Sequence, residues 1–345
     1  MAPTAPLDLD TMQSLIEQLA GQLSHAHAGD APMNAVARPA MDLARLTFAA
    51  PPASRSSVQP TDVLAAPDHS GAAPRQPGWA APTPAAGGPR GMAPYGHLAL
   101  IAEAVEANRM DVFLDPILGL ADRRARHFEL SVRLLTSAGD DLAEDDYTRA
   151  AAGTGLLARI DAAKLARAAD VLQRLRSRGS GASLFSAVAG ESLADASFAE
   201  AFTDILATEE GHATRLVLTF AQSEARVFTA AHWRTVAAMS EIGLKFALAE
   251  VTDLDMDFEL LRRHGFDFIK LDAAVFLDGL PTASGRIPAD DICRHLAGLG
   301  LGLIVGGIVA EKDLARILGF GALLGQGMLF GGPRSVEIER ERRAA

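Results

Sequence analysis

The polar residue Gln326 stands near the end of a short apolar run, residues 323–327, just before a glycine-rich turn. An earlier apolar run, 303–305, ends at two glycines, and residues 311–319 between the two runs have helical spacing. Two short buried strands joined by one helix predict a right-handed crossover with parallel strands. A barrel places its reactive side chains at the ends of such strands, so Gln326 is a candidate site residue.

A second polar pattern is the alternation of Asp253, Asp255 and Asp257, which is similar to a calcium-binding loop. However, Phe258 stands where that loop needs a glycine for its turn, and a closing bidentate glutamate is missing. The pattern therefore disfavours calcium binding, and we expect Asp253 to cap the helix that follows.

The composition excludes several classes of function. The chain has 345 residues and a net charge of −11, which gives no support to binding of a nucleic-acid polymer. Its one cysteine, Cys293, excludes an internal disulfide and fits a reducing compartment. The most apolar stretch, 299–309, is too short to span a membrane, and no export signal is visible. We therefore expect a cytoplasmic protein without a membrane span.

The first segment of the chain, residues 1–28, is predicted to be an amphipathic helix over residues 8–25. Either Asp8 or Asp10 can cap it. An isolated helix of this length cannot bury its apolar face. We expect it to dock on a protein partner, on a second copy in a homodimer or on the rest of the chain; the alternative is a marginal helix without a partner. The apolar face comprises Met12, Leu15, Ile16, Leu19 and Leu23.

Residues 29–95 are rich in alanine, proline, glycine and serine and are predicted to be a flexible linker. Within it, residues 41–48 form an apolar island, which is either a docking motif or a chance feature of an alanine-rich linker. Residues 337–345 form a charged tail. The segment between, 96–336, has the composition of a packed domain.

Short apolar runs alternate with helical segments throughout this domain. The runs predict strands at 110–117, 127–134, 182–185, 215–220, 245–251, 268–271, 302–307 and 323–327. Helical spacing is found at 98–107, 155–176, 231–241, 258–264, 289–298 and 311–319. Eight strands alternating with helices indicate an α/β fold built as a TIM-type (β/α)8 barrel.

Three motifs carry a resemblance to a known family. Residues 326–333 read Gln-Gly-Met-Leu-Phe-Gly-Gly-Pro, residues 128–133 read Phe-Glu-Leu-Ser-Val-Arg, and residues 270–272 read Lys-Leu-Asp. This set resembles the EAL domain, the bacterial family that hydrolyses cyclic di-GMP with two divalent metals at the strand ends. The resemblance covers residues 97–336 and implies a modified barrel whose first strand runs against the others.

The resemblance also implies roles for residues that match the family's motifs. Glu129 is in the place of a metal-binding glutamate and Arg133 in that of an arginine that grips a ligand phosphate, both expected at a strand end facing solvent. Lys270, Asp272 and Gln326 match polar residues of the same site. Lys270 could instead only pair with Glu129 or Asp272 across the barrel mouth, and Gln326 could only satisfy backbone groups.

Other positions depart from the family's pattern. Asp115 replaces a glutamine that contacts a guanine, and a carboxylate cannot donate as that amide does. Glu250 is a partial substitute for a lost pair of aspartates. The loop 251–258 lacks the family's glycines, so its mobility should fall. Four further positions have lost an oxygen ligand: Ala187, Thr219, Ala249 and Gly306.

What remains is too little for the family's chemistry. Two magnesium ions each need near-octahedral oxygen coordination, and the catalytic set is not intact. Glu129, Glu250 and Asp272 could hold one magnesium or calcium ion weakly, so we expect no required cofactor. The expected ligand-binding residues are Asp115, Glu129, Arg133, Lys270 and Gln326.

The sequence therefore predicts a catalytically inactive EAL domain in cyclic di-GMP signalling, acting as a receptor or docking scaffold. Its helix, long tether and altered barrel resemble the receptor-type members that position flagella. Two alternatives stay open: a ligand-independent interaction scaffold and an active phosphodiesterase.

Overall fold

The computed structural model describes residues 94–142, 144–208, 213–282 and 285–336. The helix predicted over residues 8–25, the island 41–48, almost all of the linker and the tail 337–345 lie outside the described residues. Wherever the chain from 94 to 336 is described, its helices are too short or too polar to serve as membrane spans.

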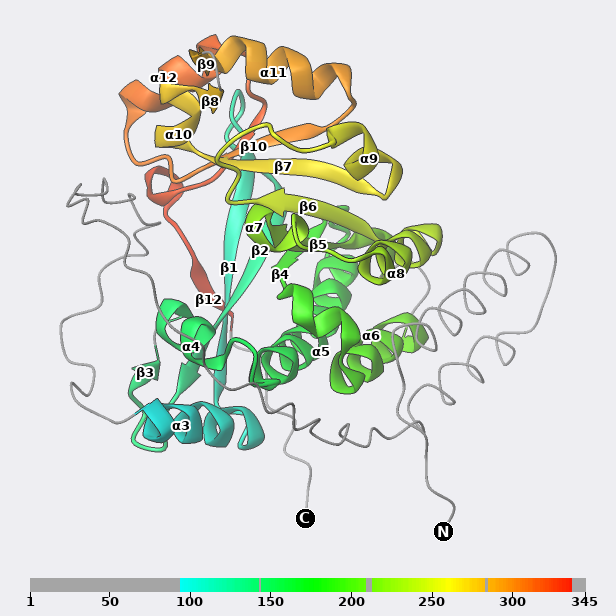
Figure 1. Cartoon of the computed structure of the whole chain (residues 1–345). Helices are drawn as coiled ribbons and strands as arrows, with labels where there is room; N and C mark the ends of the chain where they lie inside the picture. Colours follow the sequence, from blue (N-terminus) through cyan, green and yellow to red (C-terminus); the bar gives the residue numbers. More distant parts are fainter. Residues whose placement is uncertain (1–93, 143, 209–212, 283–284, 337–345) are drawn as a thin grey trace, which may run out of the picture.

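Eight strands close into a ring, because β1 pairs with β2 on one side and with β11 on the other (Figure 1). Neighbours around the rest of the ring pair in parallel, whereas β1 is antiparallel to both of its partners. The predicted eight-stranded barrel with one reversed strand is thereby confirmed. The ring strands are β1 (Met110–Gly119), β2 (Arg124–Leu135), β4 (Leu184–Ala187), β5 (Leu216–Ala221), β6 (Lys245–Ala249), β7 (Phe266–Asp272), β10 (Gly302–Gly306) and β11 (Leu324–Gly325).

Four short strands lie outside the ring. β3 (Asp141–Leu142) extends the far end of β2, and β12 (Arg334–Val336) pairs with β1 beyond the reach of β11. A separate hairpin is made by β8 (Leu280–Thr282) and β9 (Gly285–Ile287). Because β12 adds to the free part of β1, the outer edge of β1 is bordered by β12 over residues 112–114 and by β11 over 118–119 (Figure 1).

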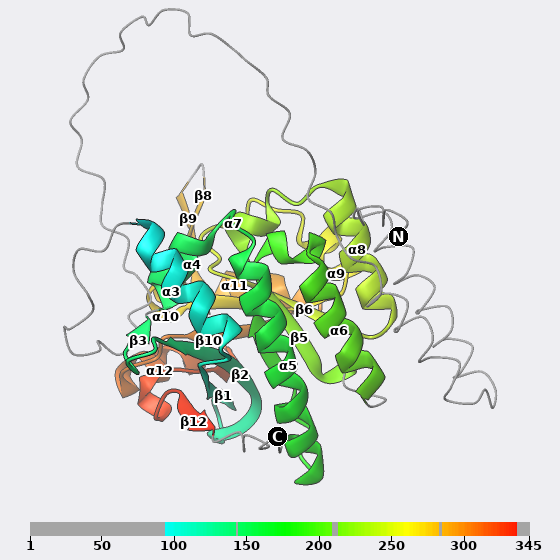
Figure 2. The same cartoon turned by 90° about the horizontal axis from the view of Figure 1, so that it is seen from below.

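Helices follow most of the parallel strands, and α5 lies against both α6 and β4 (Figure 2). The helices predicted over 289–298 and 311–319 match α11 and α12 residue for residue. The α-helices are α3 (Pro94–Glu106), α4 (Glu144–Ala151), α5 (Leu156–Ser177), α6 (Ala196–Thr208), α7 (Gln222–Ala225), α8 (Ala230–Glu241), α9 (Phe258–Arg263), α10 (Ala273–Asp278), α11 (Ala289–Gly298) and α12 (Glu311–Gly319). Three 3-10 helices complete the set: η1 (Gly190–Ala194), η2 (Ala213–Arg215) and η3 (Met328–Phe330).

The inside of the ring is filled by a compact apolar layer. The rings of Phe185 and Phe268 meet edge to face with centroids 5.0 Å apart, and His127 contacts both. A larger core lies between the ring and its helices. This inner layer fills the middle of the barrel. Polar side chains that point inward are therefore found beyond it, toward the carboxyl ends of the parallel strands. The inner layer comprises Ile117, Phe185, Val217, Ala247, Ile304, Phe268 and Leu324.

A glycine after β11 allows the last ring strand to turn. Gly327 has φ +148°, and a Cβ atom there would overlap the backbone nitrogen and oxygen of Ile308. Gly319, at the end of α12, has no atom near its hypothetical Cβ.

We therefore predict opposite effects for two glycine-to-alanine substitutions. Gly327→Ala should lower the free energy of unfolding by about 2–4 kcal/mol, because backbone must move to admit the methyl group. Gly319→Ala should raise it by about 0.5–1 kcal/mol, because alanine restricts the unfolded chain and fits the helix. Urea denaturation of both variants measures the two effects. Equal stabilities would contradict the close approach seen at Ile308.

Candidate functional site

Polar side chains gather one layer above the apolar filling of the barrel. Successive side chains of a strand point to opposite faces, so the residue two positions beyond each inner-layer residue also points inward. On the reversed strand β1 the count runs the other way, from Ile117 to Asp115, and on β2 it runs to Glu129 from His127, whose ring contacts Phe185 and Phe268. We call this set the mouth layer. It comprises Asp115, Glu129, Ala187, Thr219, Ala249, Lys270, Gly306 and Gln326.

A hydrogen-bonded group of four side chains forms the centre of the mouth layer. The Lys270 ammonium group donates to Glu129 Oε1 at very short range. Gln326 Nε2 donates to Glu129 Oε2 at 2.6 Å and approaches Asp115 Oδ2 at 3.4 Å. The structure thus brings together four of the predicted site residues, from strands β1, β2 and β7 and the end of β11. The sequence left either Glu129 or Asp272 as the partner of Lys270, and in the structure Lys270 pairs with Glu129.

The two carboxyl groups of this network differ in their electrostatics. Burial disfavours the charged form of Glu129, but the Lys270 ammonium and the Gln326 amide outweigh it and lower the pKa of that carboxyl. Burial, with the nearby charge of Glu129, raises the pKa of Asp115 to about 6, although Lys270 opposes the rise. Glu129 is therefore ionised at neutral pH, while Asp115 takes up a proton in mild acid.

Glu129 does not face solvent at a strand end, as the sequence led us to expect. It lies inside β2, and its side chain is only 17% exposed. The carboxylate is turned inward because residues facing the barrel axis alternate along β2 with those facing out. Removing it would leave the buried ammonium of Lys270 without its partner, so Glu129 is part of the folded network.

Three oxygen atoms of the mouth layer make no hydrogen bond within the described residues. They are Asp115 Oδ1, Thr219 Oγ1 and Gln326 Oε1, and each belongs to a residue that is at most 6% exposed. A buried oxygen without a partner costs about 1–3 kcal/mol, so such groups are rare unless they serve a further contact. These oxygens leave the layer with unused capacity to accept hydrogen bonds.

The residues predicted to hold one metal ion are not gathered into a site. Among the residues that the structure describes, no three His, Cys, Asp or Glu side chains lie close enough to share an ion. Asp272 Oδ1 instead accepts from the backbone nitrogen of Ala274 and caps α10. Glu250 is exposed beyond β6, with φ +53°. Because Glu129 is already neutralised by Lys270, this donor set does not fit the two-metal centre that the resemblance implies.

Arg133 lies further along β2 than Glu129 and on the same side of the strand. Its guanidinium group lies 4.3 Å from the centroid of the Phe113 ring and 3.4 Å from the Asp141 carboxylate. The side chain is 47% exposed. An exposed ion pair of this length is weak, so Arg133 can exchange it for an anionic ligand.

A buried ion pair that the sequence reasoning missed lies beneath the end of β4. Lys164 Nζ lies 2.8 Å from Asp161 Oδ1 and donates to the backbone oxygen of Ala187. Asp161 Oδ2 in turn accepts from Ala189 N and from Ser192 Oγ. These contacts fix the turn where the family's pattern expects a metal-binding asparagine. The available signal was that Asp161 and Lys164 fall on the apolar stripe of α5.

The loop after β6 is fastened by the buried side chain of Gln222. Its Oε1 accepts from Thr252 N and its Nε2 donates to the backbone oxygen of Asp253, both at 2.9 Å. The Asp253 carboxylate forms an ion pair with Arg226. The expectation that Asp253 caps the next helix is wrong, since Asp257 accepts from Leu260 N and caps α9. Asp253 lies too early in the loop to reach those amides.

A comparison with known protein families identifies the part of the chain that forms this barrel. The sequence matches the family described as EAL domain over residues 99–333. No curated protein matches it significantly.

Three similar solved structures illustrate the fold. The PaMucR phosphodiesterase in complex with c-di-GMP has a TM-score of 0.60 and 18% identity, and the match covers 70% of this chain and 98% of that one. The FimX EAL domain of Xanthomonas citri in complex with c-diGMP has a TM-score of 0.60 and 18% identity, with 70% and 95% coverage. The FimX EAL domain of Pseudomonas aeruginosa bound to c-di-GMP gives 0.56 and 21%, with 69% and 96% coverage.

Because burial raises the pKa of Asp115, replacing its carboxyl group with a neutral amide should stabilise the folded protein by an amount that depends on pH. A carboxyl whose pKa rises from 3.8 to about 6 on folding stabilises the fold when protonated, and this contribution is lost as pH rises through 6. Asp115→Asn should therefore raise the free energy of unfolding by about 1–2 kcal/mol at pH 7.5. The gain should shrink steadily between pH 6 and pH 4.

Denaturant titrations at several pH values measure this difference. Asp111→Asn, an exposed site on the same strand, is the matched control and should change stability little at any pH. A gain from Asp115→Asn that did not vary with pH would show that charge is not its cause.

Proposed function

The chain belongs to the EAL domain family, and from this membership we propose that it acts in cyclic di-GMP signalling as a receptor that binds the dinucleotide without hydrolysing it. Hydrolysis in this family depends on a water activated by metal ions held at the mouth of the barrel. Recognition needs only cations and hydrogen-bonding groups that reach the phosphates and bases.

The ion pair between Lys270 and Glu129 carries the proposal. Glu129 stands where the family's motif has a metal-binding glutamate, and here its charge is neutralised by an ammonium group. No other carboxylate of the mouth layer except Asp115 is available, and burial raises the pKa of that group. A pair of divalent cations would need several ionised oxygens that this arrangement does not offer.

Two features support a retained ability to bind the dinucleotide. Arg133 is half exposed on the same side of β2 as Glu129, so its guanidinium group can reach a phosphate. The three unpartnered oxygens of Asp115, Thr219 and Gln326 can accept hydrogen bonds from a ligand. The similar structures of PaMucR and FimX contain the same dinucleotide, which makes it the ligand to test first.

A ligand-independent scaffold is the second candidate, and the charge around the mouth favours it. Cyclic di-GMP is a dianion, and Glu250 and Asp272 would repel it because both lie exposed or half-exposed beyond the mouth layer. Since Lys270 is engaged with Glu129, Arg133 would have to provide most of the compensating charge.

Calorimetric titration of cyclic di-GMP into the full chain, with and without magnesium, distinguishes these functions. We expect binding that does not require magnesium, and no linear dinucleotide after prolonged incubation. Absence of heat at high ligand concentration would favour the scaffold instead. Release of linear dinucleotide would contradict the loss of hydrolysis.

Arg133→Ala should weaken binding by about ten-fold or more, because a charge-assisted contact to a phosphate contributes roughly 1.5–3 kcal/mol. The exposed Arg149 of α4 offers a matched control, and Arg149→Ala should leave affinity unchanged. Equal affinities of the two variants would exclude Arg133 from the site.

A further inference from the structure

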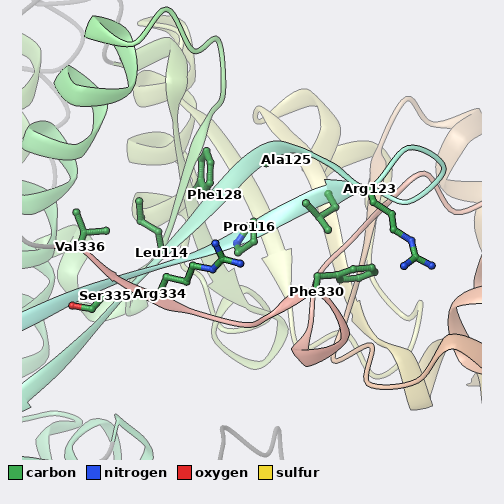
Figure 3. A pocket seen from close by; sticks show the side chains of 10 residues that line it. Leu114, Pro116, Arg123, Ala125, Phe128, Phe330, Arg334, Ser335 and Val336 are labelled. Atoms are coloured by element: carbon green, nitrogen blue, oxygen red, sulfur yellow. The ribbon is translucent and has the colours of Figure 1, made fainter.

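An apolar groove lies on the outer face of the β1–β2 hairpin, on the opposite side of β1 from Asp115. Its volume is about 450 Å³. We call it the outer groove (Figure 3). It is lined by Leu114, Pro116, Leu118, Arg123, Ala125, Phe128, Phe330, Arg334, Ser335 and Val336.

The groove exists because one strand of the barrel is reversed. β1 and β2 are joined by a tight turn at residues 120–123, so no crossover helix lies between them. Further along β2, Leu130 and Val132 are buried in the same core as Ile101 of α3. Leu114 and Phe128 remain half-buried, bordered only by β12 and η3 among the described elements.

The charge of the groove is positive in a chain with a net charge of −11. Its two charged residues are Arg123 and Arg334, and no carboxylate lines it. Arg123 is engaged with Glu311 at 2.7 Å. Arg334 forms no ion pair within the described residues, and Figure 3 shows its side chain extending over the groove toward Pro116, whereas Arg123 points away at the far end. The groove therefore suits an apolar surface that carries a carboxylate.

The chain itself contains a segment with these properties, and we propose that residues 8–25 dock in the outer groove of the same molecule. The sequence predicts an amphipathic helix there, and helices of this kind bind by laying their apolar face in a groove. The segment has three acidic residues and no lysine or arginine. Asp8 precedes Met12 by four residues and Leu15 by seven, which places it on the apolar face, where it can meet Arg334.

The acidic residues of the segment are not equivalent. At 100° per residue, Asp10 and Glu17 fall on the side of the helix opposite Leu19. They would face solvent when the apolar face is docked. Asp8 is therefore the residue whose charge should matter for docking, and Glu17 is its internal control.

The intervening chain is long enough for docking within one molecule. The 68 residues 26–93 separate the segment from Pro94, and a flexible chain of that length has a mean end-to-end distance of about 45 Å. The ten residues of β1 span about 33 Å, so any point of the hairpin is within reach of α3. A tether of this reach holds the segment near the groove at up to roughly millimolar effective concentration, and modest affinity then suffices.

Hydrogen exchange of the full chain, followed by mass spectrometry, tests the proposal. Amides of residues 8–25 should exchange about ten-fold faster in Arg334→Glu and in Asp8→Arg than in the wild type, because docking protects them. The double variant Arg334→Glu with Asp8→Arg should regain the protection, since the ion pair is restored in reverse. Leu114→Asp should abolish protection by placing a charge in the apolar groove.

Two controls separate docking from general effects of charge. Glu17→Arg changes the solvent side of the segment, and Val227→Asp changes an apolar residue that is 75% exposed between α7 and α8. Both should keep the wild-type exchange rates. Equal exchange in the wild type and all groove variants would overturn the proposal. So would protection that disappears on dilution, because the segment would then occupy the groove of a second copy.

Discussion

The contact between the Lys270 ammonium and the Glu129 carboxylate determines what the mouth of this barrel can do. Both groups are largely buried, and each is tolerated there because the other offsets its charge. The Gln326 amide donates a hydrogen bond to the second oxygen of the Glu129 carboxylate and also approaches Asp115. Protein atoms therefore balance the charge of both buried groups, and three oxygen atoms of the mouth layer remain without a hydrogen-bond partner among the described residues.

The reversal of β1 has consequences on both sides of the strand. Inside the barrel it brings Asp115 to the same layer as Glu129, since residue numbers on β1 run opposite to those on its neighbours. Outside, it removes the helix that would otherwise cover the hairpin and leaves Leu114 and Pro116 in the outer groove. The inward and outward residues alternate along a single stretch of backbone, so a contact on one face is never more than one residue from the other.

Much of the fold could be read from the sequence, because apolar runs and helical spacing depend only on local pattern. The helices 289–298 and 311–319 were anticipated from that pattern, whereas the reversed first strand was expected only from the resemblance to the EAL domain. The inward direction of Glu129 was not, because strand motifs do not show which part of a long strand lies inside the ring. The Asp161–Lys164 pair was also missed, since charges on a buried helix stripe gain their partners only through tertiary packing. Gln222 gives no local sign of the loop it fastens.

The lysine-neutralised mouth also limits how the site can change by successive substitutions. Introducing a carboxylate at the buried position Thr219 or Gly306 alone would add a second buried charge to the mouth layer, where Lys270 is already paired with Glu129, at a cost of several kcal/mol. Removing Lys270 first would leave the buried Glu129 carboxylate without the cation that offsets its charge. Each of these single substitutions is therefore less stable than the present arrangement, so the charge of the mouth layer can change at low cost only when several of its residues change together.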